Sequence, residues 1–508
     1  MLFKRGKCLF FSGIITACFV GCGGSSPSPA PAPRPVAPVA AVTQPTASPA
    51  DPLGPKPEVL LPSPYIPPAP IVYTSANGLT VWLVERHALP VVSFTMVIPN
   101  GSANDPKGAG GLAFATAGML DEGAGKLGAL ELARAVDTLG ATLRTAAAMD
   151  FSSASLTVLK RNLTPAFALF GDVVARPRFD ASEWKRVHDL WQNDLKARAS
   201  EPDAVSAVVS LAALYGAEHP YGHPTDGTIA SSSKVQLKDV KSFYASAWRP
   251  ERATLVVVGD VNRAELEPLL ASAFTSWKPS PSAPPAIVTP PAPAGPLPRL
   301  VMVDRPDAPQ SVLAFVKLGV AASDPQAPPL ARVNGALGGS FTSRLNQDLR
   351  EEHGWSYGAH SRLTFTRGAG SLIASAAVHI EKTGEALQAM LADIAEYSKA
   401  GPTAEEAQKT RLQSRSELVE MFEQVDTCAL RLARDAALGL GADYEAKASV
   451  RRDTATKEEL AKLAATVFSP AGSVLVIVGP RAKLAPILSK LGFAAPEMRD
   501  AEGERVLK

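Results

Sequence analysis

The chain has 508 residues, of which 46% are hydrophobic and 20% are charged, and its formal net charge is +2. This composition is typical of a globular protein with more than one domain, so a wholly disordered chain is excluded. A net charge so close to zero gives no electrostatic reason to expect a nucleic-acid partner, and we predict none.

Residues 1–21 have the pattern of a bacterial export signal. Three cations, Lys4, Arg5 and Lys7, precede an apolar stretch that is too short and too early for a membrane span. We therefore expect this signal peptide to direct export of the chain. A cleaved signal peptide without any lipid is the alternative.

Cys22 is the predicted lipid-attachment residue. The sequence Gly21-Cys22-Gly23 resembles a bacterial lipobox, and Ile15-Thr-Ala-Cys18 is a competing one, which makes Cys18 the alternative. Because Gly rather than Asp follows Cys22, the sorting rule of Gram-negative lipoproteins predicts the outer membrane. The sequence thus predicts a cell-envelope protein, lipid-anchored in the outer membrane and facing the periplasm.

Cysteine is almost absent from the rest of the chain. Three of the four cysteines lie within the first 22 residues, and the fourth is Cys428. A single cysteine cannot form an intramolecular disulfide framework, and a cysteine-based metal site is not expected.

Two Pro-rich segments delimit the parts that we expect to fold. Residues 22–70 are rich in Pro, Ala and Ser and cannot bury enough apolar surface, so they predict an extended tether. Residues 279–298 form a second Pro-rich segment, which we interpret as a linker. The predicted domains are therefore 71–278 and 299–500.

The two predicted domains share landmarks at a constant separation. Asp105 and Asp324 follow similar β-rich runs and are 219 positions apart, while Gly259 and Gly479 end similar apolar runs 220 positions apart. A period this long indicates a duplicated domain rather than a solenoid of short repeats.

Strands and helices succeed one another without strict alternation, which predicts α+β layers. β-branched runs predict early strands, helical patterns follow, and a late apolar strand ends each half. The expected strands are 80–84, 91–98, 255–258 and 475–478, and the expected helices are 130–139 and 183–198.

Four motifs together resemble the insulinase-like (pitrilysin-type) zinc metallopeptidases. They are the segments that begin Asn77-Gly-Leu-Thr-Val-Trp, Gly101-Ser-Ala-Asn-Asp-Pro with Gly110-Gly-Leu-Ala, His219-Pro-Tyr-Gly-His-Pro, and Ser343-Arg-Leu-Asn-Gln-Asp-Leu-Arg-Glu-Glu-His-Gly-Trp-Ser-Tyr. The resemblance covers residues 71–493. It implies two homologous α+β domains, each a mostly antiparallel sheet with helices packed on one side.

The resemblance also implies that a zinc site has been lost. Active family members carry His-x-x-Glu-His on a helix, where two histidines hold the metal and the Glu acts as general base, and a distant Glu is the third ligand. The matching positions here are Phe114, Ala117 and Gly118, and Asp194 stands at the position of the third ligand. We therefore expect no metal, no cofactor and no catalytic residue in this chain.

A substrate-contacting pair of the family is matched in the second domain. Arg350 and Tyr357 stand at its spacing, and Gly338 and Gly339 lie in a Gly-rich stretch that resembles a substrate-holding loop. A guanidinium offers fixed donors to a carbonyl, and a phenol can donate to an oxyanion. The alternative is that Arg350 forms a surface ion pair and Tyr357 packs in a strand.

This combination resembles the non-catalytic subunits of heteromeric family members. It implies a heterodimer with a zinc-bearing insulinase-like partner, in which this chain binds the peptide substrate as an added strand at a sheet edge. A peptide-binding or scaffold lipoprotein without a role in proteolysis is the alternative. An autonomous peptidase with an unusual site is a third possibility.

Overall fold

The computed structural model describes residues 64–76, 78–280, 289–291 and 299–506. The chain divides into Met1–Pro62 and Ser63–Lys508, and the fold below belongs to the second unit. The signal peptide, Cys18, Cys22 and most of both Pro-rich segments lie outside the described residues, so the expectations about them stay predictions. Within the described ranges, no helix is long and apolar enough to cross a bilayer.

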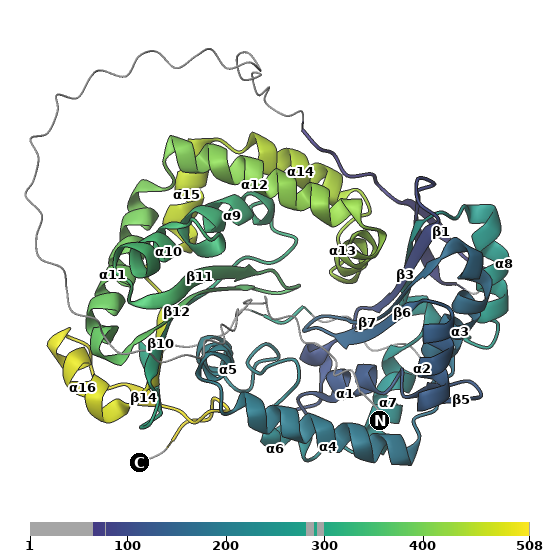
Figure 1. Cartoon of the computed structure of the whole chain (residues 1–508), viewed down its shortest axis with the longest axis horizontal. Coiled ribbons are helices and arrows are strands. Elements are labelled where there is room, and N and C mark those ends of the chain that lie inside the picture. Colours follow the sequence, from purple (N-terminus) through teal and green to yellow (C-terminus); the bar gives the residue numbers. More distant parts are fainter. Residues whose placement is uncertain (1–63, 77, 281–288, 292–298, 507–508) are drawn as a thin grey trace, which may run out of the picture. The chain divides into compact units, whose positions relative to one another are not determined.

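A six-stranded mixed sheet forms the centre of the first half, residues 64–280 (Figure 1). Its strand order is β1 (Ile71–Thr74), β2 (Thr80–Glu85), β8 (Thr254–Gly259), β3 (Val91–Ile98), β7 (Ser152–Leu159) and β6 (Thr142–Ala147). Neighbouring strands are antiparallel, except that β2 and β8 run parallel. The late strand β8 is therefore inserted in the middle of the sheet, and β6 is left at an edge.

The second half, residues 299–506, repeats this arrangement. Its strand order is β14 (Glu497–Met498), β9 (Leu300–Asp304), β13 (Val474–Gly479), β10 (Gln310–Leu318), β12 (Ser371–His379) and β11 (Ser356–Thr364). The late strand β13 again lies between two early strands, parallel to β9 and antiparallel to β10. Strand β11 occupies the same edge position as β6, as the duplication predicts.

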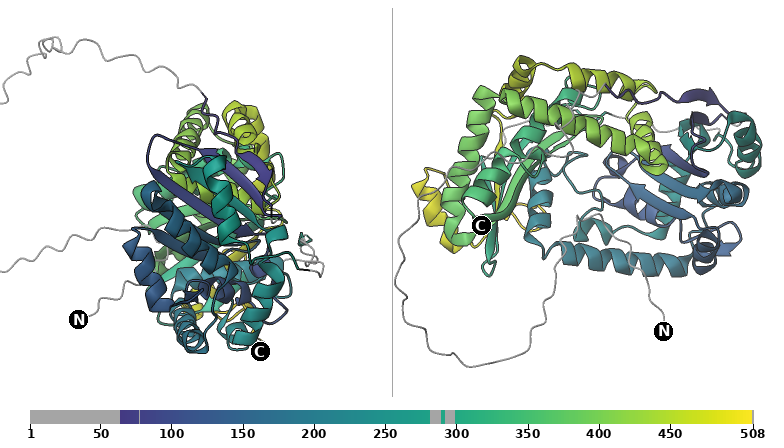
Figure 2. Two further views of the ribbon diagram at one scale, coloured as in Figure 1. Left: turned by 90° about the vertical axis from the view of Figure 1, so that its right-hand side faces the viewer. Right: turned by 45° about the horizontal axis from the view of Figure 1, so that its top comes forward.

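Helices connect the strands in both halves, and α11 and α12 lie on the outer side of the second half in further views (Figure 2). The first half contains α1 (Leu112–Gly118), α2 (Ala129–Thr138), α3 (Leu163–Ala175), α4 (Ala181–Arg198), α5 (Pro202–Tyr215), α6 (Ile229–Ser232), α7 (Leu237–Ala247) and α8 (Arg263–Ala273). The second contains α9 (Ala327–Asn334), α10 (Arg344–Asn346), α11 (Thr383–Ala400), α12 (Ala404–Glu423), α13 (Val425–Ala437), α14 (Tyr444–Thr454), α15 (Lys457–Val467) and α16 (Arg481–Lys490). The expected helices and strands are confirmed to within two residues at each end.

Each sheet is covered on both faces, and one cover comes from the other half. In β8, Leu255 and Val257 pack with the helices of the first half, whereas Val256 and Val258 pack against α13. Reciprocally, α5 of the first half packs on β10 and β13. Burial of both faces explains why the late strands are unbroken apolar runs. The expectation of helices on one side was therefore incomplete.

A buried polar junction also joins the two halves. The Tyr221 hydroxyl donates to one oxygen of the Asp150 carboxylate at 2.7 Å, and the backbone N–H of Arg367 donates to the other at 2.8 Å. The Arg367 guanidinium donates to the main-chain oxygens of Asp150 at 3.1 Å and Ala437, the last residue of α13, at 2.8 Å. Because buried polar groups are costly unless paired, this network fixes the β11–β12 connection against the first half.

Candidate functional site

Asp105 holds the first turn of α1, the helix that carries the altered zinc motif. Its carboxylate accepts hydrogen bonds from the backbone N–H groups of Gly111 (2.7 Å), Leu112 (3.1 Å) and Ala113 (2.8 Å), and from the Ser102 hydroxyl (2.9 Å). Burial raises the pKa of Asp105 to about 7, against the opposing effect of these hydrogen bonds. The sequence identified Asp105 only as a repeat landmark, and its capping role was missed. The pair Asp105-Pro106, shortly before Gly110-Gly111 at the start of the helix, was the sequence signal for this cap.

Gly111 allows α1 to approach α4 closely. Its φ of 95° lies in the left-handed region, and a Cβ there would come within 2.5 Å of the Trp191 side chain. The Trp191 indole donates to the main-chain oxygen of Asp226 at 2.9 Å, which holds the ring in place. The Gly-Leu-Ala turn therefore sets the contact between the two helices that would have to share a zinc ion.

The three altered motif positions lie together on α1. The Phe114 side chain is 39% exposed, and its ring centroid is 6.0 Å from that of Trp191. Ala117 is buried, and a Cβ added at Gly118 would meet no heavy atom within 4 Å. None of these side chains has an atom that can coordinate a metal ion. The apolar contact between Phe114 and Trp191 is found where zinc ligands would be needed.

Asp194 is exposed on α4, one turn beyond Trp191. Burial raises the pKa of the Asp226 carboxyl, its ion pair with Arg198 opposes that shift, and the charge of Asp194 adds to it. One carboxylate cannot supply the three protein ligands of a zinc site. The described part of the chain contains no group of three His, Cys, Asp or Glu side chains that could hold a metal ion. The residues present therefore do not fit zinc.

Arg350 and Tyr357 are both presented at the surface of the second half. Arg350 lies on the helical turn η5 (Gln347–Glu352), with its guanidinium 4.7 Å from the ring centroid of Phe341 and 3.4 Å from the Glu351 carboxylate. Tyr357 lies at the start of the edge strand β11, and its side chain is 80% exposed. The phenol is thus in a strand without being packed, and both side chains can reach a ligand.

The Gly-rich stretch forms the helical turn η4 (Gly335–Gly339), which packs against β11. A Cβ at Gly338 would lie 2.7 Å from the backbone nitrogen of Ser361, and a Cβ at the exposed Gly339 would lie 3.0 Å from the main-chain oxygen of Asn334, so both positions favour glycine. The Asn334 amide donates to the main-chain oxygen of Ser361 at 3.0 Å. The outer edge of β11 is therefore partly occupied by the chain itself.

Strand β6 offers the freer edge. Within the described ranges it pairs with β7 only, and its residues alternate between exposed and half-buried. Helix α1 lies against it, so this edge passes beside the altered motif. An added peptide strand could satisfy the outward-facing N–H and C=O groups of β6.

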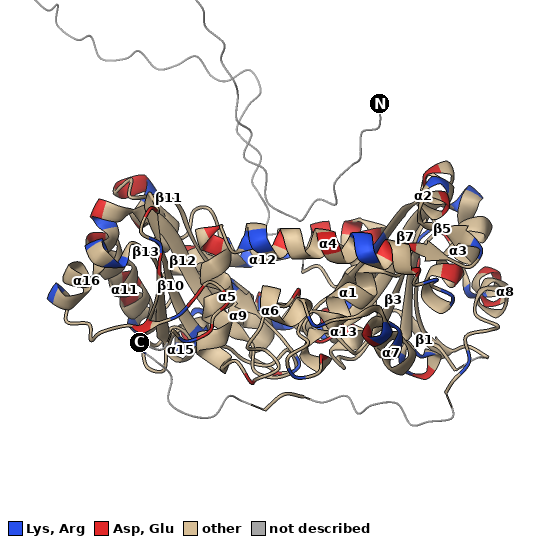
Figure 3. Ribbon diagram, turned by 90° about the horizontal axis from the view of Figure 1, so that it is seen from below, with Lys and Arg blue, Asp and Glu red and all other residues tan. Residues whose placement is uncertain are grey.

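Charges of both signs are mixed over the surface. Lys and Arg alternate with Asp and Glu along α4 and α12 in the view from below (Figure 3). This mixed pattern on the face in view suits contacts with ordinary peptides and proteins better than binding to a polyanion.

Comparisons with known proteins identify the fold family. Residues 80–225 match the model of the insulinase family (peptidase family M16), and residues 234–414 match that of the peptidase M16 inactive domain. An uncharacterised zinc protease of Mycobacterium leprae is 27% identical over 366 residues, 71% of this chain and 81% of that protein. A non-peptidase homolog of Helicobacter pylori is 24% identical over 177 residues, 35% of this chain and 41% of that protein.

A solved structure agrees with these matches. The crystal structure of a peptidase M16 inactive domain from Pseudomonas fluorescens superimposes with a TM-score of 0.74 at 25% identity, covering 81% of this chain and 98% of that one. The resemblance stated from the sequence and the duplicated α+β fold are thereby confirmed. One of these relatives is named a zinc protease and another a non-peptidase homolog. In this chain the side chains on α1 provide no zinc ligand. The chain belongs to the insulinase family of peptidases, M16, as a member of the inactive type.

Proposed function

We propose that this chain is the substrate-binding, non-catalytic subunit of a heteromeric insulinase-family peptidase in the bacterial cell envelope. The observation that carries the proposal is a separation of features within one chain. Arg350 is partly exposed, Tyr357 is exposed and both lie on packed elements, whereas Phe114, Ala117 and Gly118 leave α1 without any metal donor. Such a chain can hold a substrate and needs a partner for hydrolysis.

In this proposal the chain positions the peptide and stabilises developing charge. The substrate adds as an extra strand along the free edge of β6, where main-chain hydrogen bonds tolerate varied side chains. The Arg350 guanidinium and the Tyr357 hydroxyl donate to substrate oxygens at the partner's site. The zinc ion of the partner would supply an activated water molecule.

The envelope location rests on the N-terminal sequence. Lipid on Cys22 would anchor the chain, and the Pro-rich residues 22–70 would let the folded unit stand off the membrane surface. An anchored binding subunit meets peptides in the periplasm, which fits a role in their degradation or processing.

The test is reconstitution with an insulinase-family chain of the same organism that retains His-x-x-Glu-His. Alone, the purified chain should contain substoichiometric zinc and show no peptidase activity, and the mixture should cleave peptides. Arg350→Ala and Tyr357→Phe should each lower kcat/KM of the mixture by about a hundredfold, the effect of removing one oxyanion donor. Arg505→Ala, at an exposed arginine paired with Glu497, is the matched control and should leave turnover unchanged.

Unchanged turnover in both Arg350→Ala and Tyr357→Phe would contradict the proposed role of the pair. A chain that stays monomeric beside every such partner, and that gains no activity, would instead support a scaffold lipoprotein. Peptide binding to the lone chain, followed by fluorescence anisotropy of a labelled peptide, separates a binding scaffold from a purely structural one.

A further inference from the structure

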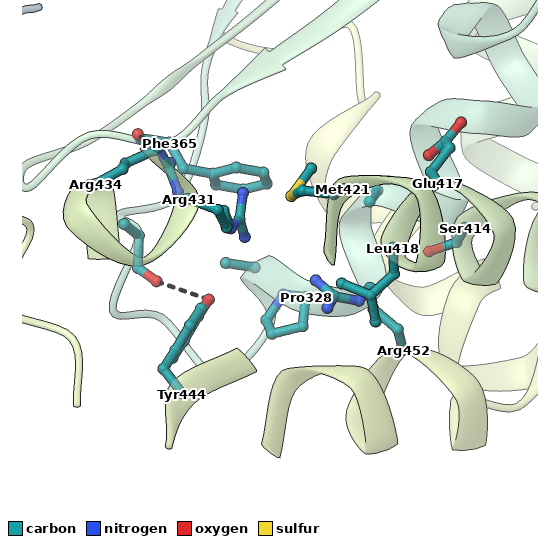
Figure 4. A pocket seen from close by; sticks show the side chains of 13 residues that line it. Pro328, Phe365, Ser414, Glu417, Leu418, Met421, Arg431, Arg434, Tyr444 and Arg452 are labelled. Carbon is teal, nitrogen blue, oxygen red and sulfur yellow. Dashed lines mark hydrogen bonds between the residues drawn. The ribbon is translucent and has the colours of Figure 1, made fainter. Parts of the chain in front are cut away.

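A cavity of about 160 Å³ lies in the second half, away from α1, β6 and Tyr357. It is lined by residues of α9, α12, α13, α14 and the connection that follows β11 (Figure 4). Pro328, Phe365, Leu418 and Met421 provide its apolar wall. The pocket is partly open to solvent, and a closed apolar cavity of about this volume holds one benzene ring, so a phenyl-sized body fits here.

Three arginines line the same cavity. Arg431 and Arg434 come from α13 and Arg452 comes from α14, and Arg431 lies beside the Phe365 ring in the close-up (Figure 4). Behind them are two carboxylates, Asp435 and Glu445, whose side chains are only 1% and 2% exposed. The exposed carboxylate of Glu417 also lines the cavity, so the excess of positive charge, three arginines against two carboxylates, is confined to its buried side.

The charge excess grows towards the acidic side of neutral pH. Burial raises the pKa of Asp435, while the nearby Arg431 opposes the shift. The pKa of Glu445 is lowered, because its arginine partners Arg431 and Arg452 outweigh its burial. Protonation of Asp435 would leave three arginines balanced by one buried carboxylate.

Donors of these arginines remain available. Arg431 bonds Glu445 through Nε and Nη2, and Arg452 bonds the other Glu445 oxygen through Nη2 at 2.8 Å. Arg434 uses Nη1 for Asp435 at 3.4 Å and Nη2 for the main-chain oxygen of Phe365 at 3.0 Å. Over the described ranges, Nη1 of Arg431 and of Arg452 has no hydrogen-bond partner. The buried carboxylates thus orient the guanidinium groups without using all of their donors.

We propose that this cavity binds a small organic carboxylate with a phenyl-sized or branched apolar body. The carboxylate would accept from the free guanidinium donors, and the body would contact Phe365, Leu418 and Met421. Two sources share this chemistry: the C-terminal residue of a hydrophobic peptide and a free aromatic acid. The inference does not depend on the role proposed for Arg350 and Tyr357.

Occupancy should also stabilise the association of the two halves. Helix α13 contributes Arg431 and Arg434 to the cavity, and its other face packs on β3 and β8 of the first half. A ligand that binds only the folded arrangement raises its stability by mass action. Thermal unfolding of the full chain is therefore a readout of binding.

The test uses 3-phenylpropanoate with the full chain, in calorimetric titration and thermal unfolding. The neutral 3-phenylpropanamide and acetate are the matched probes, since each lacks one of the two recognised features. We expect 3-phenylpropanoate to raise Tm and to bind at least about tenfold more tightly than either, as a charge-assisted hydrogen bond and apolar burial both contribute. The tripeptide Gly-Gly-Phe distinguishes the sources: tighter binding than 3-phenylpropanoate assigns a peptide C-terminus, and weaker binding assigns a free acid.

Three variants locate the binding. Ala331→Leu fills the cavity from an exposed position of α9 without changing charge, and it should abolish binding. Arg452→Gln removes one of the two free Nη1 donors and should weaken binding about tenfold. Glu417→Gln removes an exposed carboxylate from the lining and should not weaken it. Arg431 is left intact because it neutralises both buried carboxylates.

Equal affinity for the amide or for acetate would overturn the proposal, as would an absence of any binding. Unchanged binding in folded Ala331→Leu would place the ligand elsewhere and overturn it too. Circular dichroism verifies folding, and if Ala331→Leu does not fold, the Arg452→Gln result decides.

Discussion

The ring centroids of Phe114 and Trp191 lie 6.0 Å apart, joining α1 to α4 where active family members hold zinc between corresponding helices. Gly111 permits this contact, because any side chain there would collide with the Trp191 ring. Asp194 follows on the same face of α4, since positions three apart are neighbours on a helix. The helix pair is thus kept in place by apolar packing and by the Asp105 cap instead of a metal.

Rebuilding the three ligands should restore metal binding. Phe114→His with Gly118→His places two imidazoles four residues apart on α1, where Gly118 has open space, and Asp194→Glu supplies the third ligand. We expect this triple variant to bind one Zn²⁺, measured by elemental analysis after dialysis. The same variant with Asp194→Ala should lose it. Peptidase activity should stay absent, because Ala117 still provides no general base. A triple variant that binds no zinc would contradict the assignment of these three positions to the zinc ligands of the family.

The cap of α1 should make stability depend on pH. The pKa of Asp105 is about 7 in the folded chain, above its ordinary value of 3.8, so the folded state binds a proton more tightly than the unfolded state. The contribution of this group to stability is therefore full below about pH 4 and is lost as pH rises towards 7. Asp105→Asn keeps an acceptor oxygen and should reduce the decline in the free energy of unfolding between pH 5 and pH 8, measured by urea denaturation.

Asp105→Ala provides the second arm of this experiment. It removes the acceptor as well as the charge and should lower the free energy of unfolding by about 1 kcal/mol at pH 5, the usual cost of losing a helix cap. An unaltered pH profile in Asp105→Asn would show that other groups cause the dependence.

Local sequence patterns predicted the elements but not the contacts between the halves. The apolar runs of β8 and β13 predicted late strands, yet nothing near them specifies α13 or α5 as the cover of their second face, because those helices are far away in sequence. Likewise, Phe114 and Asp194 were identified by their positions in the family motifs, whereas the contact between Phe114 and Trp191 is known only from the folded structure. Pairings such as Asp150 with Arg367 leave no periodic signal and required the structure.

The junction between the halves should be a large single contribution to stability. Asp150→Ala leaves the Tyr221 hydroxyl and the Arg367 backbone N–H without their buried acceptor, so we expect a loss of about 3 kcal/mol in the free energy of unfolding. Asp189→Ala, at an exposed carboxylate paired with Lys185, is the control and should change it by less than about 1 kcal/mol. Equal effects in urea denaturation would argue against a structural role for the junction.

Lipid attachment is predicted at Cys22. Cys22→Ser should abolish incorporation of labelled fatty acid and release the chain from the membrane fraction, while Cys18→Ser should leave both unchanged, because only the Gly21-Cys22-Gly23 lipobox is then used. The opposite pattern would move the attachment to Cys18. Retained export without lipid in both single variants and in the parent would indicate an ordinary cleaved signal.

Cys428 should report the docking of α13 on the first half. Its thiol is fully buried among Val256, Val258 and Leu432, and burial raises its pKa to about 11. Because the thiolate is the reactive form, iodoacetamide at pH 8 should modify Cys428 only when α13 opens. The experiment uses a chain in which Cys8, Cys18 and Cys22 are replaced by Ser, with modification followed by mass spectrometry.

Two leucines of α13 separate local opening from general reactivity. Leu432 is 1% exposed against the first sheet, so Leu432→Ala should weaken docking by about 3 kcal/mol and speed modification of Cys428 by roughly a hundredfold. Leu430 is 39% exposed on the same helix, and Leu430→Ala should leave the rate close to that of the parent. Rapid modification of the parent chain at pH 8 would mean that α13 is not held on the first sheet. Equal modification rates in the two variants would mean that the contact of Leu432 with the first sheet does not protect the Cys428 thiol.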